Sequence, residues 1–197
     1  MATTTVDIYN RALDRIGVSE AVRSEGDDTQ ERIICEREYP AARDAVLSLF
    51  PWACARKRAT LAIMDEAPAF GFSRAFRLPP DFHSIVEIDG SPRREGFVLE
   101  GDRLLSNAEM CRIIYISNAV GAHELSPHVA ELLSLELARR IVPGLSSRGV
   151  NVSGSLLQEC WASEYPRAMA AEVRNNFPRP QPNRLIEFDR PFPGVAR

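Results

Sequence analysis

The chain has 197 residues, of which 45% are hydrophobic and 26% are charged, and its formal net charge at pH 7 is -3. This composition is typical of a folded globular protein and excludes wholesale disorder, collagen and coiled-coil rods. The slight acidic excess also argues against a protein that grips nucleic acid over its whole surface. Lys57 is the only lysine among 24 basic residues, a bias that a GC-rich genome explains, although arginine also suits interfaces better than lysine does.

Cysteine usage and the N-terminal residues predict a protein made in a reducing cytosol. The four cysteines are widely spaced and form no CxxC pair, which argues against a zinc ribbon or a redox motif. We therefore expect them to act as small buried hydrophobes. The N-terminus is polar and no stretch approaches the ~18 apolar residues of a membrane span, so we expect neither a leader nor a membrane.

Two helices are predicted in the first fifty residues. The first begins at Thr4 or Thr5, either of which can cap it, and carries apolar residues at helical spacing as far as Gly17. The second is predicted over residues 29–50. Pro40 lies inside it and lacks a backbone donor, so we expect a kink or a break there.

The pattern changes over residues 57–117, where prolines, glycines and alternating apolar residues replace helical spacing. We predict a small antiparallel β unit inserted between helices, with Gly101 and Asp102 forming a two-residue turn. The predicted strands cover residues 74–78, 84–88, 97–100, 103–105 and 111–116. At the start of this region Trp52 precedes three basic residues, and we interpret it as a core residue rather than a stacking platform for nucleic acid.

Two further helices follow the β unit. The third begins with Ser126 as its cap and stops at Pro143 and Gly144. The last is capped by Ser153 or Ser155 and is interrupted at Pro166.

Residues 175–197 contain five prolines, which favour extended chain. Their apolar side chains need a groove, either on the core of the same chain or on a partner, and we favour the partner. The predicted docking residues of this arm are Phe177, Arg179, Leu185, Ile186, Phe188 and Phe192.

These elements predict a mainly α fold: a helical bundle with a small antiparallel β insertion and an extended C-terminal arm. The bundle is expected to comprise residues 1–56 and 118–174, with the β domain at 57–117 and the Pro-rich arm at 175–197.

The sequence shows no pattern typical of catalysis or cofactor binding. Phosphate-binding loops of the GxxxxGK[ST] and GxGxxG types are absent, as are the GxSxG and HExxH motifs. His128 and Glu131 share a helical face, but no second histidine completes a metal-ligand set. We therefore predict a protein that is not an enzyme, with no catalytic residues, no cofactor and no metal.

Several segments, taken in order, resemble the tail tubular protein A family of tailed bacteriophages, the head-to-tail adaptors. The resemblance covers residues 3–173 and is densest before residue 120. The segments that carry it are residues 3–17 (TTTVDIYNRALDRIG), 39–47 (YPAARDAVL), 50–55 (FPWACA), 58–62 (RATLA), 67–72 (APAFGF) and 76–81 (FRLPPD). Pro166 and the long Pro-rich terminus depart from the family's pattern.

The resemblance implies a helical bundle with a β insertion and a structural role in the virion. Members form a ring of twelve copies beneath the portal protein and carry the tail nozzle or tail tube proteins. Genomic double-stranded DNA passes through the lumen without sequence-specific binding. This chain is then expected at the head-tail interface of the virion, after synthesis in the host cytoplasm.

A ring subunit needs two unlike faces that meet head to tail. Charge-assisted pairs would fix the register between copies, and the third helix offers candidates for them. The predicted ring-interface residues are Glu131, Glu136, Arg139 and Arg140. The alternative interpretation of these four residues is ordinary surface charge.

Two other functions stay open at this point. One is a tail-associated cell-wall hydrolase, which would need a carboxylate in a cleft. The other is a stand-alone binding module whose arm folds onto its own core.

Overall fold

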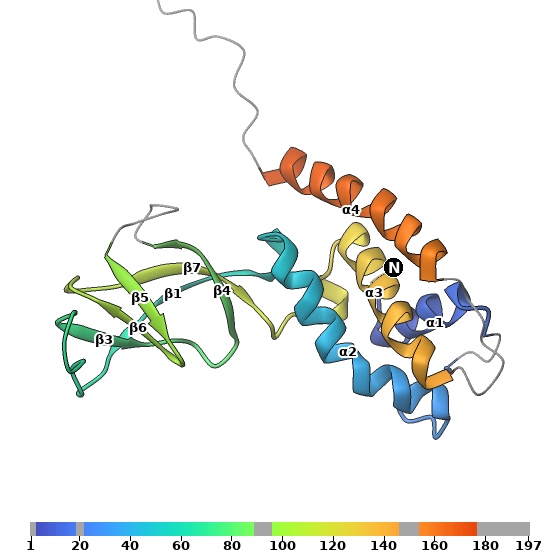
Figure 1. Cartoon of the computed structure of the whole chain (residues 1–197), viewed down its shortest axis with the longest axis horizontal. Helices are drawn as coiled ribbons and strands as arrows, with labels where there is room; N and C mark the ends of the chain where they lie inside the picture. Colours follow the sequence, from blue (N-terminus) through green and yellow to red (C-terminus); the bar gives the residue numbers. More distant parts are fainter. Residues whose placement is uncertain (1–2, 19–21, 89–95, 146–153, 177–197) are drawn as a thin grey trace, which may run out of the picture.

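The computed structural model describes residues 3–18, 22–88, 96–145 and 154–176. In these ranges helices lie on one side of the molecule and antiparallel strands lie on the other (Figure 1). The α-helices are α1 (Thr5–Arg15), α2 (Gln30–Leu49), α3 (Pro127–Leu145) and α4 (Gly154–Asn176). Two short 3-10 turns, η1 (Ala53–Ala55) and η2 (Ala122–Glu124), lie where the chain passes between helices and strands.

Helix α1 begins and ends as predicted. Thr4 is its N-cap and accepts a hydrogen bond from the Asp7 backbone N–H, while the Asp7 carboxylate accepts one from the Thr4 backbone N–H. This reciprocal pair is a capping box, which satisfies donors that the first turn leaves free. Gly17 follows the helix with φ +75°, the left-handed conformation expected at a helix end.

The predicted helix breaks at Pro40, Pro143 and Pro166 are wrong, whereas a kink, the other expectation at Pro40, stays a prediction. Helix α2 runs through Pro40, α3 runs through Pro143 to Leu145, and α4 runs through Pro166. All three prolines are exposed, so water can hydrate the carbonyl group that the missing N–H would have engaged. The packing of the buried faces then keeps each helix continuous.

Helix α3 is the centre of the helical part, because it packs against α1, α2 and α4. Its predicted inward residues are all buried, and they are Val129, Leu132, Leu133, Leu137 and Ile141. The helix also buries Leu135 and Ala138, so that apolar contact surrounds most of it. Trp52, after the end of α2, joins the same core with no exposed surface, as predicted.

The strands form two antiparallel sheets between α2 and α3. The three-stranded sheet has the order β1–β7–β4, and the four-stranded sheet has the order β2–β3–β6–β5. Their bounds are β1 (Arg56–Thr60), β2 (Ala62–Ile63), β3 (Arg74–Arg77), β4 (Phe82–Ile88), β5 (Phe97–Glu100), β6 (Arg103–Ser106) and β7 (Arg112–Ser117). A second core of side chains from both sheets, including Phe76, Leu104 and Ile113, is separate from the helical core.

The protein is therefore a mixed α/β protein rather than a purely helical bundle. The prediction of helices with antiparallel strands between them is confirmed, and each predicted strand corresponds to an observed one within two residues at either end. Strands β1 and β2 were not predicted. The predicted arm begins two residues too early, because Asn175 and Asn176 belong to α4, and the rest of it, residues 177–197, lies outside the described residues.

The cysteines of the described residues are free thiols. Cys35 and Cys111 are buried and the other two are half-buried, in line with the predicted role as small hydrophobes. Burial raises the pKa of Cys35 to about 12, which keeps that thiol protonated at neutral pH.

Candidate functional site

A cluster of polar side chains around Asp81 ties the three-stranded sheet together at its end nearest the helices. Asp81 comes directly before β4, whereas Lys57 belongs to β1 and both Tyr115 and Ser117 belong to β7. Because β7 lies between β1 and β4, the register brings these residues to one place. The carboxylate accepts hydrogen bonds from Lys57 Nζ (2.8 Å), Ser117 Oγ (2.7 Å) and Tyr115 Oη (3.0 Å).

The charges in this Asp81 cluster support one another. The hydrogen bond from Lys57, followed by those from Ser117 and Tyr115, lowers the pKa of Asp81 to about 2. The hydrogen bond to Asp81 also raises the pKa of Lys57. Burial is the main cause that raises the pKa of Tyr115, and its bond to Asp81 adds to the effect. At neutral pH the cluster is therefore an ion pair braced by two hydroxyl groups, an arrangement that fixes geometry.

Helix α4 is fastened to the segment that links α2 to β1. The buried Glu172 carboxylate accepts a hydrogen bond from the Ala53 backbone N–H at the start of η1. About two helical turns earlier, Tyr165 Oη donates to the carbonyl of Leu49 at 3.2 Å. Trp52 Nε1 donates to the carbonyl of Val46 at 2.8 Å. The last turns of α4 are thus held beside the end of α2.

The structure separates the four predicted ring-interface residues into two groups. Glu136 has a side chain only 4% exposed, and it pairs with Arg139 and Arg140 on the same helix. Arg139 donates from Nη2 at 2.7 Å and from Nε at 3.0 Å, while Arg140 donates from Nε at 2.7 Å. These three residues border a cavity of about 280 Å³ between α2, α3 and α4. Arg139 remains 59% exposed, so its outer surface can still meet another molecule.

Glu131 forms the second group, with arginines of α1. Its carboxylate pairs with Arg15, and Arg11 lies 4.0 Å away. The predicted alternative of ordinary surface charge therefore applies only partly to Glu131, because the residue links α3 to α1. Contact of any of the four residues with a neighbouring copy stays a prediction.

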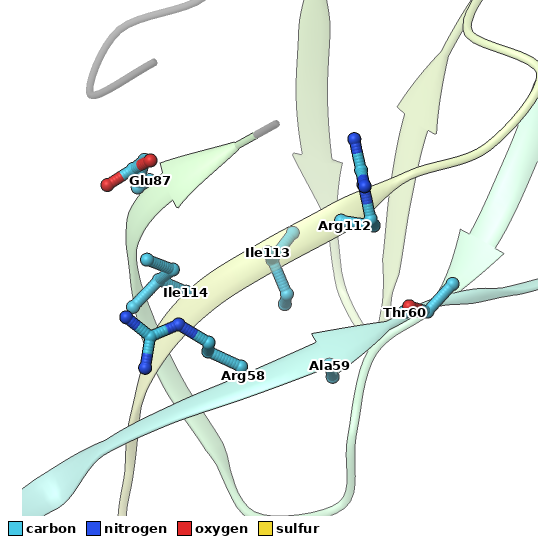
Figure 2. A pocket seen from close by; sticks show the side chains of 7 residues that line it. All are labelled: Arg58, Ala59, Thr60, Glu87, Arg112, Ile113 and Ile114. Atoms are coloured by element: carbon cyan, nitrogen blue, oxygen red, sulfur yellow. The ribbon is translucent and has the colours of Figure 1, made fainter. Parts of the chain in front are cut away.

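A pocket of about 500 Å³ opens on the three-stranded sheet (Figure 2). Arg58 of β1, Ile114 of β7 and Glu87 of β4 lie in one row across the strands. In Figure 2 the Arg58 and Ile114 side chains lie next to each other, with Glu87 beyond them. We call this feature the Arg58 pocket, and its lining residues are Arg58, Ala59, Thr60, Glu87, Arg112, Ile113 and Ile114.

The six predicted arm residues, Phe177, Arg179, Leu185, Ile186, Phe188 and Phe192, lie outside the described residues. Sequence analysis also missed the Asp81 cluster and the Arg58 pocket. The single lysine and the FRLPPD segment were both visible, but only the pairing of β1 and β4 with β7 brings them together.

No family model matches this chain, and no curated protein matches its sequence. The resemblance to phage adaptors therefore rests on the motifs and their order. Among the described residues, no helix is long and apolar enough to cross a membrane. The same residues contain no group of three or more His, Cys, Asp or Glu side chains placed to hold a metal ion.

Proposed function

We propose that this chain is a structural, non-catalytic head-to-tail adaptor of a tailed bacteriophage. In this proposal it forms a ring, of twelve copies as in the family it resembles, between the portal protein and the tail nozzle or tube proteins. Genomic DNA passes through the lumen of that ring, and the site of action is the virion.

The observation that carries the proposal is that segments resembling the adaptor family contact one another in three dimensions. Tyr9 of the first segment packs edge-on against Tyr39 of the second, with 5.6 Å between ring centroids. Trp52 of the third segment bonds to the carbonyl of Val46 in the second. Ala62 of the fourth segment pairs with Arg77 of the last across β2 and β3. The segments that carry the resemblance thus belong to one folded unit, and this supports the proposal.

For the ring contact, the proposal uses the exposed surface of α3. Of the four predicted residues, Arg139 has the most exposed side chain, and its bonds to Glu136 hold the guanidinium in a fixed position. A pre-positioned guanidinium loses less conformational freedom when a carboxylate of the next copy binds it. Arg139→Glu should therefore weaken ring assembly, and intact assembly of this variant would remove α3 from the interface.

For portal attachment, the proposal uses the arm after Asn176. Helix α4 is anchored at Ala53 through Glu172, so the arm starts from a fixed point of the folded part. An arm that orders on binding can cover a large partner surface at a cost in entropy.

For DNA passage, the proposal needs a lumen without tight phosphate contacts, because such contacts would oppose sliding. The net charge of -3 suits a neutral or repelling wall. A strongly basic lumen in a reconstruction of the assembled ring would contradict this part of the proposal.

The testing experiment is the mass of the purified chain, alone and mixed with the portal protein of the same phage. A monomer that becomes a ring on the portal supports the adaptor role with templated assembly, and a ring in both samples supports the role without templating. A monomer in both samples, with no portal binding, would overturn the proposal.

Two variants locate the attachment. Deletion of residues 177–197 should abolish portal binding while leaving the circular dichroism spectrum of the folded part unchanged. A full-length control, in which Phe177, Leu185, Ile186, Phe188 and Phe192 are changed to Ser, keeps the prolines and the length of the arm. Loss of binding in both variants assigns the contact to the apolar side chains, whereas normal binding by the deletion would refute the arm's role.

A further inference from the structure

The loop between β2 and β3 presents an aromatic side chain to solvent. Phe70 is 87% exposed, the highest value among the large exposed hydrophobic residues of the described ranges. The loop that carries it joins β2 and β3, on the side of the β unit away from the helices (Figure 1). Gly71, which follows Phe70, has φ +86°, a conformation that side-chain-bearing residues rarely adopt, and Pro68 restricts the backbone before it. The turn therefore presents the Phe70 ring to solvent, where another molecule can cover it.

The same loop is acidic. Asp65 and Glu66 are both exposed, and neither has a hydrogen bond or an ion pair within the described part of the chain. The loop thus combines one apolar ring with two unengaged carboxylates, and a matching surface should offer an apolar hollow with a basic rim.

The Arg58 pocket has these properties. Its volume of about 500 Å³ is within the roughly 300–1,000 Å³ range of ligand pockets and admits a phenyl ring. Ile114 supplies an apolar wall, and the exposed Arg58 lies beside it without a hydrogen bond or an ion pair to any described residue. A guanidinium beside an aromatic face attracts the ring, and the same group can pair with a carboxylate at the rim. Glu87 lies on the other side of Ile114 from Arg58, so its carboxylate leaves the Arg58 edge of the pocket basic.

We propose that Phe70 of one copy inserts into the Arg58 pocket of a second copy of this chain, with Asp65 and Glu66 facing Arg58. This inference rests on the proposed function, since it supplies a contact between ring neighbours. The loop joins strands of the four-stranded sheet, whereas the pocket lies on the three-stranded sheet, so the two surfaces are unlike. Contacts between unlike surfaces are head to tail and close into a ring when the rotation permits.

The first test measures self-association of wild type and Phe70→Ala by sedimentation velocity across a concentration series, both alone and with the portal protein. A buried aromatic anchor dominates such contacts, so we expect association to weaken about tenfold or more. Leu156→Ala is the matched control, because Leu156 is a large hydrophobic residue, 52% exposed, on α4. Equal association of wild type and Phe70→Ala would overturn the inference.

The second test exchanges the charges. Arg58→Glu should weaken association, because it places a carboxylate against Asp65 and Glu66 of the next copy. Adding Asp65→Arg and Glu66→Arg to the same chain should restore association, since opposite charges then face each other again. Failure of this triple variant to recover, with its thermal unfolding unchanged, would contradict the proposed pairing.

The third test distinguishes this inference from the proposed function. The photoreactive aromatic p-benzoylphenylalanine, placed at position 70, should cross-link to residues 58–60 or 112–114 of another copy when the full chain is irradiated alone and with the portal protein. Portal binding without such cross-links would overturn the contact between Phe70 and the Arg58 pocket but would still support the adaptor role. Cross-links at these positions without portal binding would support the contact between copies and refute the adaptor role. Absence of both would overturn both.

Discussion

Replacing Asp81 by Asn should destabilise the β unit through the three side chains that the carboxylate holds. Asn removes the charge that pairs with Lys57, and its single carbonyl oxygen cannot accept all three bonds. Ser117 has no exposed surface, so a hydroxyl that loses its acceptor there cannot turn to water. We therefore expect a loss of stability rather than a neutral exchange.

The magnitude follows from the pKa of Asp81. A decrease from 3.8 to about 2 corresponds to roughly 2–3 kcal/mol, since each pKa unit is worth about 1.4 kcal/mol. The Asp81 side chain is 20% exposed, so solvent screening reduces the ionic part to about 1–2 kcal/mol. An unmatched buried donor costs roughly 1–3 kcal/mol. Because these two contributions overlap, we expect about 2 kcal/mol for Asp81→Asn at pH 7.

The assay is urea unfolding of wild type and variant at a series of pH values, since urea leaves the ionic strength unchanged. The folded-state pKa is depressed, so the Asp81 contribution is present above pH 4 and disappears as the pH falls towards 2. The difference in the free energy of unfolding should therefore shrink on acidification. Asp102→Asn, at an exposed turn, is the matched control for the loss of a carboxylate. A difference below about 0.5 kcal/mol at pH 7, or one independent of pH, would refute the reasoning.

Three further changes test the helical part by thermal or urea unfolding. Thr4→Ala removes the acceptor for the Asp7 backbone N–H and should cost about 1 kcal/mol, and a loss below 0.3 kcal/mol would mean that the capping box contributes little in solution. Trp52→Phe keeps most of the apolar bulk but leaves the carbonyl of Val46 without the indole N–H that donates to it. We expect the free energy of unfolding to fall by about 1–3 kcal/mol. Unchanged stability would show that this hydrogen bond does not stabilise the fold. Glu136→Ala removes the carboxylate that pairs with Arg139 and Arg140. Because both guanidinium groups can turn to water, we expect the free energy of unfolding to fall by only about 1–2 kcal/mol. A loss above about 4 kcal/mol would show that the guanidinium groups stay buried without a partner.

Local signals in the sequence were sufficient for the helix starts and for most strands. Thr4 and Gly17 mark the ends of α1 because capping depends on the nearest few residues. The break predicted at Pro40 is wrong although the proline does remove a backbone donor. Whether that loss interrupts the helix depends on whether the proline lies on the exposed or the buried side of the helix. The exposure of that side is a property of the tertiary structure.

The candidate sites depend on pairing between distant segments, which a single sequence does not reveal. The basic run at Arg56 to Arg58 forms β1, with Lys57 paired opposite Tyr115, and no local pattern in the run indicated a strand. Asp81 is 24 residues from Lys57 and 36 from Ser117, so no local spacing rule links them. The Arg58 pocket requires the register of three strands, and one residue of slip would turn Arg58 to the opposite face.

The chain enters and leaves the β unit through adjacent strands. Arg56, the first residue of β1, pairs directly with Ile116 near the end of β7, so the two connections to the helices lie about 5 Å apart. The helices therefore enclose their core whether the excursion between these residues is long or short. A short turn could therefore replace the β unit without moving the ends of the helices that flank it. Its loops can likewise change in length or sequence without altering the path of the helical chain.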